Sequence, residues 1–373
     1  MRILNINSYY YSSSVHRQLQ KSLKINGVDT FTYVPLTKGY VPRSECIYGD
    51  EKHVLSSECY NEFDRYIFHL KHNKILGDIK QRINLKDFTC MHAHSLFSNG
   101  YIAMRIKEEV GTPYIVAVRA TDLNLFFKYM VHLKPLGKKI LNQADKIIFL
   151  SETYRDFLIE RYVQEQYRDG ILKKSVLIPN GIDDFWLNNK GPVKQLHVGS
   201  TVKLIHVGVI SKRKNLSTTV KAVEFLKKKG YEVLLTVVGR VVDESIFNQI
   251  KKLPYVKYIP PVSKEELIKI YRENDVFVMP SITETFGLVY PEAMSQGLPV
   301  LYTKGQGFDG QFDDGEVGYS VNCFDAEEIA DKIICIMKNY SAISERAIVN
   351  STKFDWNILS KEYKEIYNSL LMV

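Results

Sequence analysis

Short apolar runs alternate with helix-like segments along the whole chain, and this alternation restricts the possible folds more than any other feature. Residues 1–7 form the first run, a polar loop follows, and residues 15–24 carry apolar side chains at helical spacing before Gly27. Strands that alternate with helices pair in parallel, because each helix returns the chain to the same end of the sheet. Further apolar runs in the first half lie at residues 88–92, 114–118 and 146–150.

The second half of the chain repeats this rhythm. Its apolar runs lie at residues 202–207, 233–238, 256–259, 275–279 and 299–302. A chain of 373 residues is also longer than one hydrophobic core usually supports. We therefore predict an α/β fold of two Rossmann-like, doubly wound domains that face each other across a cleft.

The domain limits follow from a turn-rich stretch at residues 180–192, which suits a linker. We place the first domain at residues 1–186 and the second at residues 187–355. Residues 356–373 carry apolar side chains at helical spacing. We expect them to form a helix that packs back on the first domain.

The charge distribution and the cysteine content restrict the binding partners and the cellular compartment that the chain fits. The formal net charge is +8, and residues 1–190 hold 27 Lys and Arg against 20 Asp and Glu. This basic half fits an anionic membrane, a lipid phosphate or nucleic acid, although a solvated surface gives the same count. The five cysteines are scattered without a C-x-x-C pair, which is typical of a reduced, cytoplasmic chain. With no signal-peptide pattern and no run of roughly 20 apolar residues, we expect any membrane contact to be peripheral.

Two glutamates, Glu284 and Glu292, bracket a Phe286-Gly287 turn. The turn lies between an expected strand at 275–279 and an expected helix at 288–296, so it presents backbone N–H groups at a helix N-terminus. Such a terminus attracts a diphosphate, and the two carboxylates can accept hydrogen bonds from sugar or ribose hydroxyls. Acidic residues are also common near helix starts, so the pattern alone leaves a purely structural role open.

A basic loop follows the expected strand at 202–207. It contains Gly208 and then Lys212, Arg213 and Lys214 before the next helix. Open α/β sheets bind ligands at the carboxyl ends of their strands, where three cations can neutralise a diphosphate leaving group. A solvated basic turn is the alternative, and the pairing with the glutamate-bounded turn favours the ligand site.

Together these segments resemble the group 1 family of retaining glycosyltransferases, which have the GT-B architecture, of the bacterial surface-polysaccharide type. The resemblance covers nearly the whole chain and rests on five segments in order: His92-Ala93-His94-Ser95, residues 144–151, residues 176–183, residues 208–214 and residues 284–292. Their ordered combination is more specific than any single segment.

The resemblance implies roles for these residues. Arg213, Lys214 and Glu284 would act in catalysis: Arg213 and Lys214 would hold the donor diphosphate, and Glu284 would bind the donor sugar. Glu292 would bind the ribose. It also implies that the anomeric configuration is retained without a metal ion or other cofactor, and the chain has no DxD motif. The first domain would bind the acceptor and the second the nucleotide sugar. The other donor-binding residues implied are Gly208, Tyr258, Ile259, Thr285, Phe286, Gly287 and Leu288.

Two segments depart from the family pattern. Ser12 and Ser13 stand where many relatives have a glycine pair, and we expect their hydroxyl and amide groups to bind the donor phosphate instead. Arg119 stands where many relatives have a histidine; Arg does not exchange protons at neutral pH, so we expect a catalytic charge clamp that Asp122 orients. A structural ion pair of these two residues is the alternative.

On the acceptor side we expect His94 and Asp122. His92 and His94 lie two residues apart at a strand end, which resembles a metal-binding pair. Because no third ligand is evident in the sequence, we expect no metal there.

A basic amphipathic segment at residues 128–141 mixes lysines with large apolar side chains. Such a segment can lie at an anionic membrane surface. The interruption by Pro135 and Gly137 weakens this interpretation, and a solvated cationic face over an apolar core is the alternative.

The sequence therefore predicts a cytoplasmic transferase, and the basic segment adds the expectation of peripheral contact with the inner face of the membrane. It would move a sugar from a nucleoside diphosphate sugar, with UDP as the favoured nucleotide, to a hydroxyl of a glycan or lipid-linked acceptor in surface-polysaccharide synthesis. We expect no nucleic-acid partner. The alternatives are a non-catalytic nucleotide-sugar-binding partner of a transferase and a sugar-nucleotide epimerase of the same architecture. A nicotinamide dehydrogenase is disfavoured, because no G-x-G-x-x-G turn follows the first strand.

Overall fold

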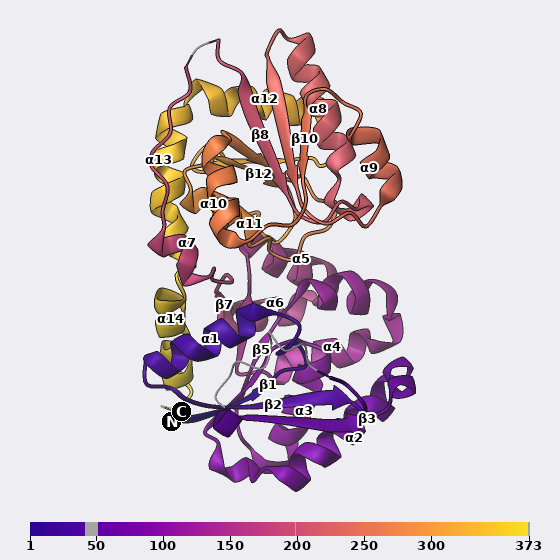
Figure 1. The fold of residues 1–373 in the computed structure, drawn as a ribbon. Coiled ribbons are helices and arrows are strands. Elements are labelled where there is room, and N and C mark those ends of the chain that lie inside the picture. Colours follow the sequence, from indigo (N-terminus) through magenta and orange to yellow (C-terminus); the bar gives the residue numbers. More distant parts are fainter. Residues whose placement is uncertain (42–50, 198, 372–373) are drawn as a thin grey trace. The chain divides into compact units, whose positions relative to one another are not determined.

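The computed structural model describes residues 1–41, 51–197 and 199–371, and it divides into two compact units (Figure 1). The first unit comprises residues 1–150, 154–181 and 356–373, and the second comprises residues 151–153 and 182–355. The division at 181–182 lies a few residues before the expected limit at 186–187. Each unit is built on one parallel sheet.

The sheet of the first unit has seven parallel strands in the order β3-β2-β1-β4-β5-β6-β7. Their apolar side chains form the buried core of this unit. The strands are β1 Arg2–Ile6, β2 Asp29–Thr37, β3 Val54–Tyr60, β4 Cys90–Ala93, β5 Tyr114–Ala117, β6 Lys146–Phe149 and β7 Ser175–Leu177.

Helices cover this sheet. Helix α2 contacts α3, α3 contacts α4 and α4 contacts α6, whereas α1 contacts α14. The α-helices are α1 Ser14–Ile25, α2 Phe68–Arg82, α3 Ser98–Val110, α4 Lys134–Gln143, α5 Glu152–Tyr162, α6 Glu165–Lys174 and α14 Trp356–Ser369. Short 3-10 turns lie at Glu51–His53, Glu62–Tyr66, Leu85–Asp87 and Val131–Leu133, and a π-helical turn lies at Asp122–Phe127.

The second unit has a six-stranded parallel sheet in the order β10-β9-β8-β11-β12-β13. Its strands are β8 Val202–Val207, β9 Val233–Val238, β10 Val256–Ile259, β11 Val276–Val278, β12 Val300–Thr303 and β13 Gly318–Val321. Its helices are α7 Asp184–Asn188, α8 Leu216–Lys228, α9 Glu244–Ile250, α10 Lys264–Glu273, α11 Val289–Ser295, α12 Ala326–Lys338 and α13 Tyr340–Asn350, with 3-10 turns at Lys212–Lys214 and Ser351–Phe354.

The predicted fold class is confirmed, because both halves are parallel α/β units. In the range that the structure describes, no helix is long and apolar enough to cross a bilayer. In both sheets the first strand pairs on both sides, β1 with β2 and β4, and β8 with β9 and β11. The strand order reverses at such a strand, which is where open α/β sheets bind ligands.

Helix α14 lies along α1 within the first unit (Figure 1). The Ser22 hydroxyl donates to the Trp356 carbonyl at 2.9 Å, and the Trp356 indole N–H donates to Gln18 Oε1 at 2.8 Å. The indole is buried, and a Cβ at Gly181 would lie 2.6 Å from it. Only glycine, which has no Cβ, therefore fits at position 181 without displacing the Trp356 indole.

We predict that Gly181→Ala lowers the free energy of unfolding by about 1–3 kcal/mol, because the added methyl group overpacks the indole contact. Gly77→Ala is the matched control: it lies in the exposed interior of α2 with open space around it, and alanine there should stabilise by about 0.5–1 kcal/mol. Urea unfolding of both variants measures the difference. Equal effects of the two substitutions would contradict the packing argument.

Candidate active site

Two loops at the carboxyl edge of the second sheet form the candidate site. Residues 208–215 follow β8 and carry Arg213 and Lys214, while residues 279–288 follow β11 and carry Glu284. Because β8 and β11 are neighbours, the two loops leave the sheet side by side. This is the point of strand-order reversal in the second unit.

Asn215 joins the two loops. Its φ of 57° is a left-handed conformation that Asn adopts more readily than most residues. Its side-chain NH₂ donates to the Pro280 carbonyl at 2.9 Å and to the Cys323 carbonyl at 2.5 Å. Its Oδ1 accepts from the Thr218 hydroxyl at 2.8 Å. The end of the basic loop is therefore fixed to the loop that follows β11.

The second loop turns at Gly287. Its φ is 81°, and a Cβ there would lie 2.3 Å from the Tyr290 ring. That ring is buried, and the Tyr290 hydroxyl donates to the Met279 carbonyl at 2.7 Å. Earlier in the same loop, the Ile282 N–H donates to the Arg213 carbonyl at 2.9 Å. Backbone shape and packing thus both require glycine at the turn.

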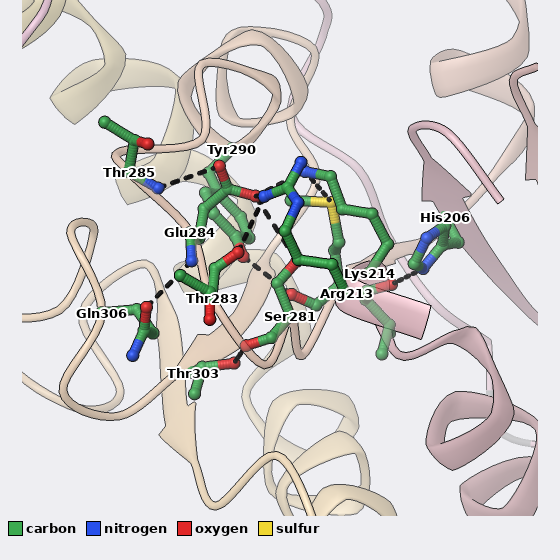
Figure 2. Close-up of polar contacts among 12 residues, drawn as sticks. His206, Arg213, Lys214, Ser281, Thr283, Glu284, Thr285, Tyr290, Thr303 and Gln306 are labelled. Atoms are coloured by element: carbon green, nitrogen blue, oxygen red, sulfur yellow. Dashed lines mark hydrogen bonds and ion pairs between the residues drawn. The ribbon is translucent and has the colours of Figure 1, made fainter. Parts of the chain in front are cut away.

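Lys214 and Glu284 form an ion pair inside this frame (Figure 2). Both residues are buried, at 8% and 7% exposure, so little water screens their attraction. Arg213 Nη1 lies 3.9 Å from Glu284 Oε2 and donates to the Thr283 carbonyl at 2.8 Å. The Arg213 side chain is 49% exposed. The charge of Lys214 is therefore neutralised inside the site, whereas the charge of Arg213 lies at its surface.

The loop that follows β12 holds the backbone of Glu284. The Glu284 N–H donates to Gln306 Oε1 at 2.8 Å, and the Gly307 N–H donates to the Glu284 carbonyl at 3.3 Å (Figure 2 shows Gln306 beside Glu284). A Cβ at Gly307 would lie 1.8 Å from the Thr285 carbonyl oxygen. The Glu284 carboxylate also accepts from the Thr285 N–H at 3.2 Å. These contacts fix where the carboxylate lies.

His206 lies in β8 near Lys214 (Figure 2). Its Nδ1 is 3.0 Å from the Val278 carbonyl, and because a carbonyl only accepts, Nδ1 carries the proton. Burial, and then the charge of Lys214, lower the pKa of His206 to about 3. The imidazole is therefore neutral and adds no second charge behind Lys214.

Glu292 lies on α11, beyond the Gly287 turn. Burial raises the pKa of its carboxyl to about 7; the charge of Lys264 opposes this rise and that of Asp183 adds to it. Lys264 and Asp183 are themselves paired at 2.6 Å. Glu292 is therefore poised to change its charge near neutral pH, unlike an ordinary glutamate.

Tyr258 and Ile259 end strand β10 at the edge of the sheet. The Tyr258 hydroxyl donates to the Gly239 carbonyl at 3.0 Å. Gly239 itself follows β9, with a φ of 148°, and a Cβ there would lie 1.9 Å from the Gly208 carbonyl oxygen. The backbones after β8 and β9 thus approach closely, and the Tyr258 side chain contacts the second of them through its hydroxyl.

In the first unit, buried histidines form a neutral network at the carboxyl ends of β1 and β4. His94 Nε2 lies 3.1 Å from Asn5 Oδ1, and since this oxygen only accepts, Nε2 carries the proton. The His92 ring stacks on His94 at 4.0 Å and its Nδ1 lies 2.8 Å from the Tyr367 hydroxyl. Burial lowers the pKa of both histidines well below the usual value. At 1% exposure, His94 lies inside this network rather than on an open surface.

Arg119 and Asp122 do not form a side-chain ion pair. The Asp122 carboxylate accepts from the backbone N–H groups of Leu96, Phe97 and Arg119 at 3.1, 3.1 and 2.8 Å. Burial raises the pKa of Asp122 to about 6, and these hydrogen bonds oppose the rise. The Arg119 guanidinium donates instead to neutral oxygens, the His94 carbonyl at 3.2 Å and Asn180 Oδ1 at 3.3 Å. Asp122 therefore orients Arg119 only through the backbone.

Ser12 and Ser13 belong to a tight turn before α1. The N–H groups of both residues donate to the Tyr9 carbonyl, at 3.0 and 3.2 Å, and so does the Ser12 hydroxyl at 3.0 Å. The donors of Ser12 are therefore used within the turn. The first turn of α1 carries no acidic residue, so the positive end of its dipole stays uncompensated by a side chain.

Comparison with known proteins agrees with this geometry. The model for group 1 glycosyl transferases matches residues 190–354, and the model for glycosyltransferase family 4 matches residues 15–184. The chain belongs to the group 1 glycosyltransferases. This confirms the resemblance predicted from the motifs.

Individual relatives are distant. The transferase is 25% identical over 299 residues to the phosphatidyl-myo-inositol mannosyltransferase of Mycobacterium leprae, covering 76% of this chain and 74% of that protein. It is 29% identical over 259 residues to the capsular polysaccharide biosynthesis glycosyltransferase CapM of Staphylococcus aureus, covering 66% and 67%.

Solved structures share the GT-B fold. Sucrose-phosphate synthase from Thermosynechococcus elongatus superposes with a TM-score of 0.76 at 18% identity, covering 100% of this chain and 99% of that one. Anabaena HepE in complex with UDP and glucose superposes with a TM-score of 0.69 at 14% identity, covering 99% and 100%. The transferase is therefore a GT-B protein.

Apart from Ser12 and Ser13, the expected donor residues of the transferase lie in the second unit: Gly208, Arg213, Lys214, Tyr258, Ile259, Glu284, Thr285, Phe286, Gly287, Leu288 and Glu292. Phe286 packs in the core against Phe308 and Phe354, so its backbone alone remains for a ligand. The other expected residues lie in the first unit: Ser12, Ser13, His94, Arg119 and Asp122. The sequence interpretation assigned no role to Asn215, His206 and Gln306, which hold or adjoin the ion pair.

The raised pKa of Glu292 predicts a pH-dependent stability of the transferase. A carboxyl with a pKa of about 7 in the folded state and 4.5 when unfolded favours folding in its protonated form. Ionisation of the Glu292 carboxyl therefore lowers the free energy of unfolding. This loss is absent below pH 4.5, grows between pH 4.5 and 7, and is complete above pH 7. We predict that Glu292→Gln raises the unfolding free energy at pH 8 by at most ~3 kcal/mol and leaves it unchanged at pH 4.5.

Thermal unfolding at several pH values measures this effect, with the exposed Glu345→Gln as the matched control. The same Glu292→Gln variant should bind the nucleotide donor more weakly, because an amide is a poorer acceptor for ribose hydroxyls than a carboxylate. A stability difference that does not vary with pH would contradict the assignment of the buried charge.

Proposed function

We propose that the transferase moves a sugar from a UDP-sugar to a hydroxyl of a glycan or lipid-linked acceptor during cell-surface polysaccharide synthesis, with retention of anomeric configuration and without a metal ion. The buried Lys214–Glu284 pair, with Arg213 at its rim, is the observation that carries this proposal. It supplies a cation for a diphosphate and an acceptor for sugar hydroxyls at one place. HepE, which shares the fold, was solved with UDP and glucose bound.

Donor binding would exchange partners within the ion pair. A diphosphate carries more negative charge than the Glu284 carboxylate, so it attracts Lys214 and Arg213 together. The sugar hydroxyls then donate to Glu284, which loses its lysine. His206 stays neutral through burial, and it neither repels the lysine nor competes for it. The empty site thus keeps both charges satisfied until the donor arrives.

The chemical step follows from the same contacts. The bond between the anomeric carbon and the phosphate oxygen breaks, and the electron pair leaves with the diphosphate. Arg213 and Lys214 stabilise the charge that develops on that oxygen, a role which a metal ion plays in other transferases. The acceptor oxygen bonds to the anomeric carbon on the face that the diphosphate leaves, and its proton passes to a phosphate oxygen.

The acceptor class is supported by the relatives. One is described as a capsular polysaccharide biosynthesis enzyme and another as a phosphatidyl-myo-inositol mannosyltransferase. We place this transferase in the cytoplasm, in peripheral contact with the inner face of the membrane, where glycan and lipid-linked acceptors are both accessible.

The first test is nucleotide release from a panel of UDP-, GDP- and ADP-sugars, with and without EDTA. We expect slow release from a UDP-sugar that EDTA does not reduce and that Arg213→Ala lowers by roughly 100-fold, because a charge-stabilising group is lost. With the acceptor present, NMR of the product should show the anomeric configuration of the donor. An inverted product or EDTA-sensitive turnover would refute the mechanism, and tight UDP binding without any release would favour a binding-only protein.

The ion pair predicts opposite effects on nucleotide binding and on turnover. We predict that Glu284→Gln binds UDP several-fold more tightly, because Lys214 no longer has a carboxylate partner. The same variant should turn over the donor roughly 100-fold more slowly, because the charged acceptor for the sugar is lost. Calorimetry with UDP and the release assay measure the two effects. Lys221→Ala, an exposed lysine on α8 outside the site, is the control. Weaker UDP binding by Glu284→Gln would contradict the exchange of partners.

A further inference from the structure

Large apolar side chains are exposed on two segments of the first unit. In residues 63–70, which follow β3 and include the start of α2, Phe63 is 84% exposed and Tyr66 is 85% exposed. In residues 125–131, before α4, Tyr129 is 66% exposed. Single exposed apolar residues need no explanation, but a group of them does. We call this group the aromatic patch; its members are Phe63, Tyr66, Ile67, Leu70, Leu125, Tyr129 and Val131.

The two segments meet through partly buried rings. The Phe68 ring lies 6.1 Å from the Phe126 ring, and each also packs inward, Phe68 on Tyr101 at 5.7 Å and Phe126 on Phe97 at 4.6 Å. The exposed members flank these anchored rings on both segments. The two exposed segments are therefore joined by the Phe68–Phe126 contact and rest on rings that pack inward.

Positive charge accompanies the patch. Arg65 lies between Phe63 and Tyr66, and Lys128 adjoins Tyr129, 5.2 Å above its ring. Within the described part of the chain, no acidic side chain is within ion-pair distance of Arg65 or Lys128. The nearby Asp64 is paired with Lys74 at 2.8 Å. The patch thus presents apolar and cationic groups together.

This surface differs from the one expected from residues 128–141. In that segment Leu133, Ile140 and Leu141 are buried in the core, so the apolar face of α4 supports the fold. Pro135 lies in the first turn of α4, where a proline fits without breaking the helix. Only the start of the expected segment, at Tyr129 and Val131, contributes to the patch.

We propose that the aromatic patch docks the transferase on the interfacial region of an anionic bilayer. Phe63, Tyr66 and Tyr129 insert among the headgroups, where aromatic rings are favoured. Arg65 and Lys128 bind lipid phosphates, since their charges are free and complementary to those lipids. This gives the membrane contact of the proposed function a defined surface, and it does not depend on catalysis, because vesicle binding needs no substrate.

The test is co-sedimentation of the full-length protein with vesicles of phosphatidylcholine alone or with phosphatidylglycerol. We expect binding to the anionic vesicles that weakens with salt. The triple variant Phe63→Ser, Tyr66→Ser, Ile67→Ser should lower the partition coefficient at least tenfold, and Arg65→Glu with Lys128→Glu should abolish the preference for anionic lipid. The control is Val242→Ser with Phe324→Ser, which removes two exposed apolar side chains from the second unit.

Circular dichroism and an unchanged affinity for UDP check that each variant is folded. UDP affinity serves this purpose because it is measured without vesicles. Wild-type binding by both patch variants would overturn the proposal, as would equal losses in the control. If the triple variant instead changes the sedimentation coefficient without lipid, the patch binds a second copy of the chain and the membrane assignment is wrong.

Discussion

The buried ion pair of Lys214 and Glu284 is the interaction on which the candidate active site depends. The desolvation free energy of two buried charges usually exceeds the gain from their attraction. Such a pair therefore persists only where neighbouring residues hold both side chains in place. Three loops do so here: Asn215 ties the basic loop down, Gly287 lets the second loop turn, and Gln306 holds the Glu284 backbone. The loops are thus shaped around a pair of charges whose burial adds little to stability.

The first unit handles buried polar groups in a different way. Its buried His92 and His94 are neutral, Asp122 accepts hydrogen bonds from backbone N–H groups, and the Arg119 guanidinium donates to neutral oxygens. The guanidinium therefore has no carboxylate as a hydrogen-bond partner, and the nearby Asp122 attracts its charge only through space. A negative group that approaches it gains attraction without first displacing a carboxylate, which contrasts with Lys214 in the second unit.

Much of the fold was predictable because apolar runs and turn residues report local structure. The expected strand at 233–238 matches β9 residue for residue, and that at 202–207 matches β8. Strands β2 and β3 were missed, since β2 contains Pro35 and β3 mixes serines and a glutamate with apolar residues. Both lie towards the edge of the sheet, where pairing rather than hydrophobicity defines the strand.

The candidate site was predictable as a set of motifs and not as a set of contacts. Arg213, Lys214 and Glu284 were expected at one place, but Gln306, which holds the Glu284 backbone, comes from the loop after β12. The neutral state of His206, in the strand before the basic loop, depends on burial that only the packed sheet provides. Similarly, the helical spacing of apolar residues in 128–141 does not determine whether these residues pack in the core or lie at the surface. The burial of His94 also required the packed structure, because it depends on the stacking of His92 and on helix α14.

The assignment of α14 to the first unit has a consequence for synthesis of the protein on the ribosome. The first unit is completed only by residues 356–373, whereas nearly all of the second unit lies between residues 182 and 355. The second unit can therefore finish folding while the sheet that begins the chain still waits for Trp356 to cover α1. Loss of residues 356–373 would therefore leave a folded second unit joined to a first unit whose α1 face is uncovered, a product that exposes apolar surface to chaperones and proteases.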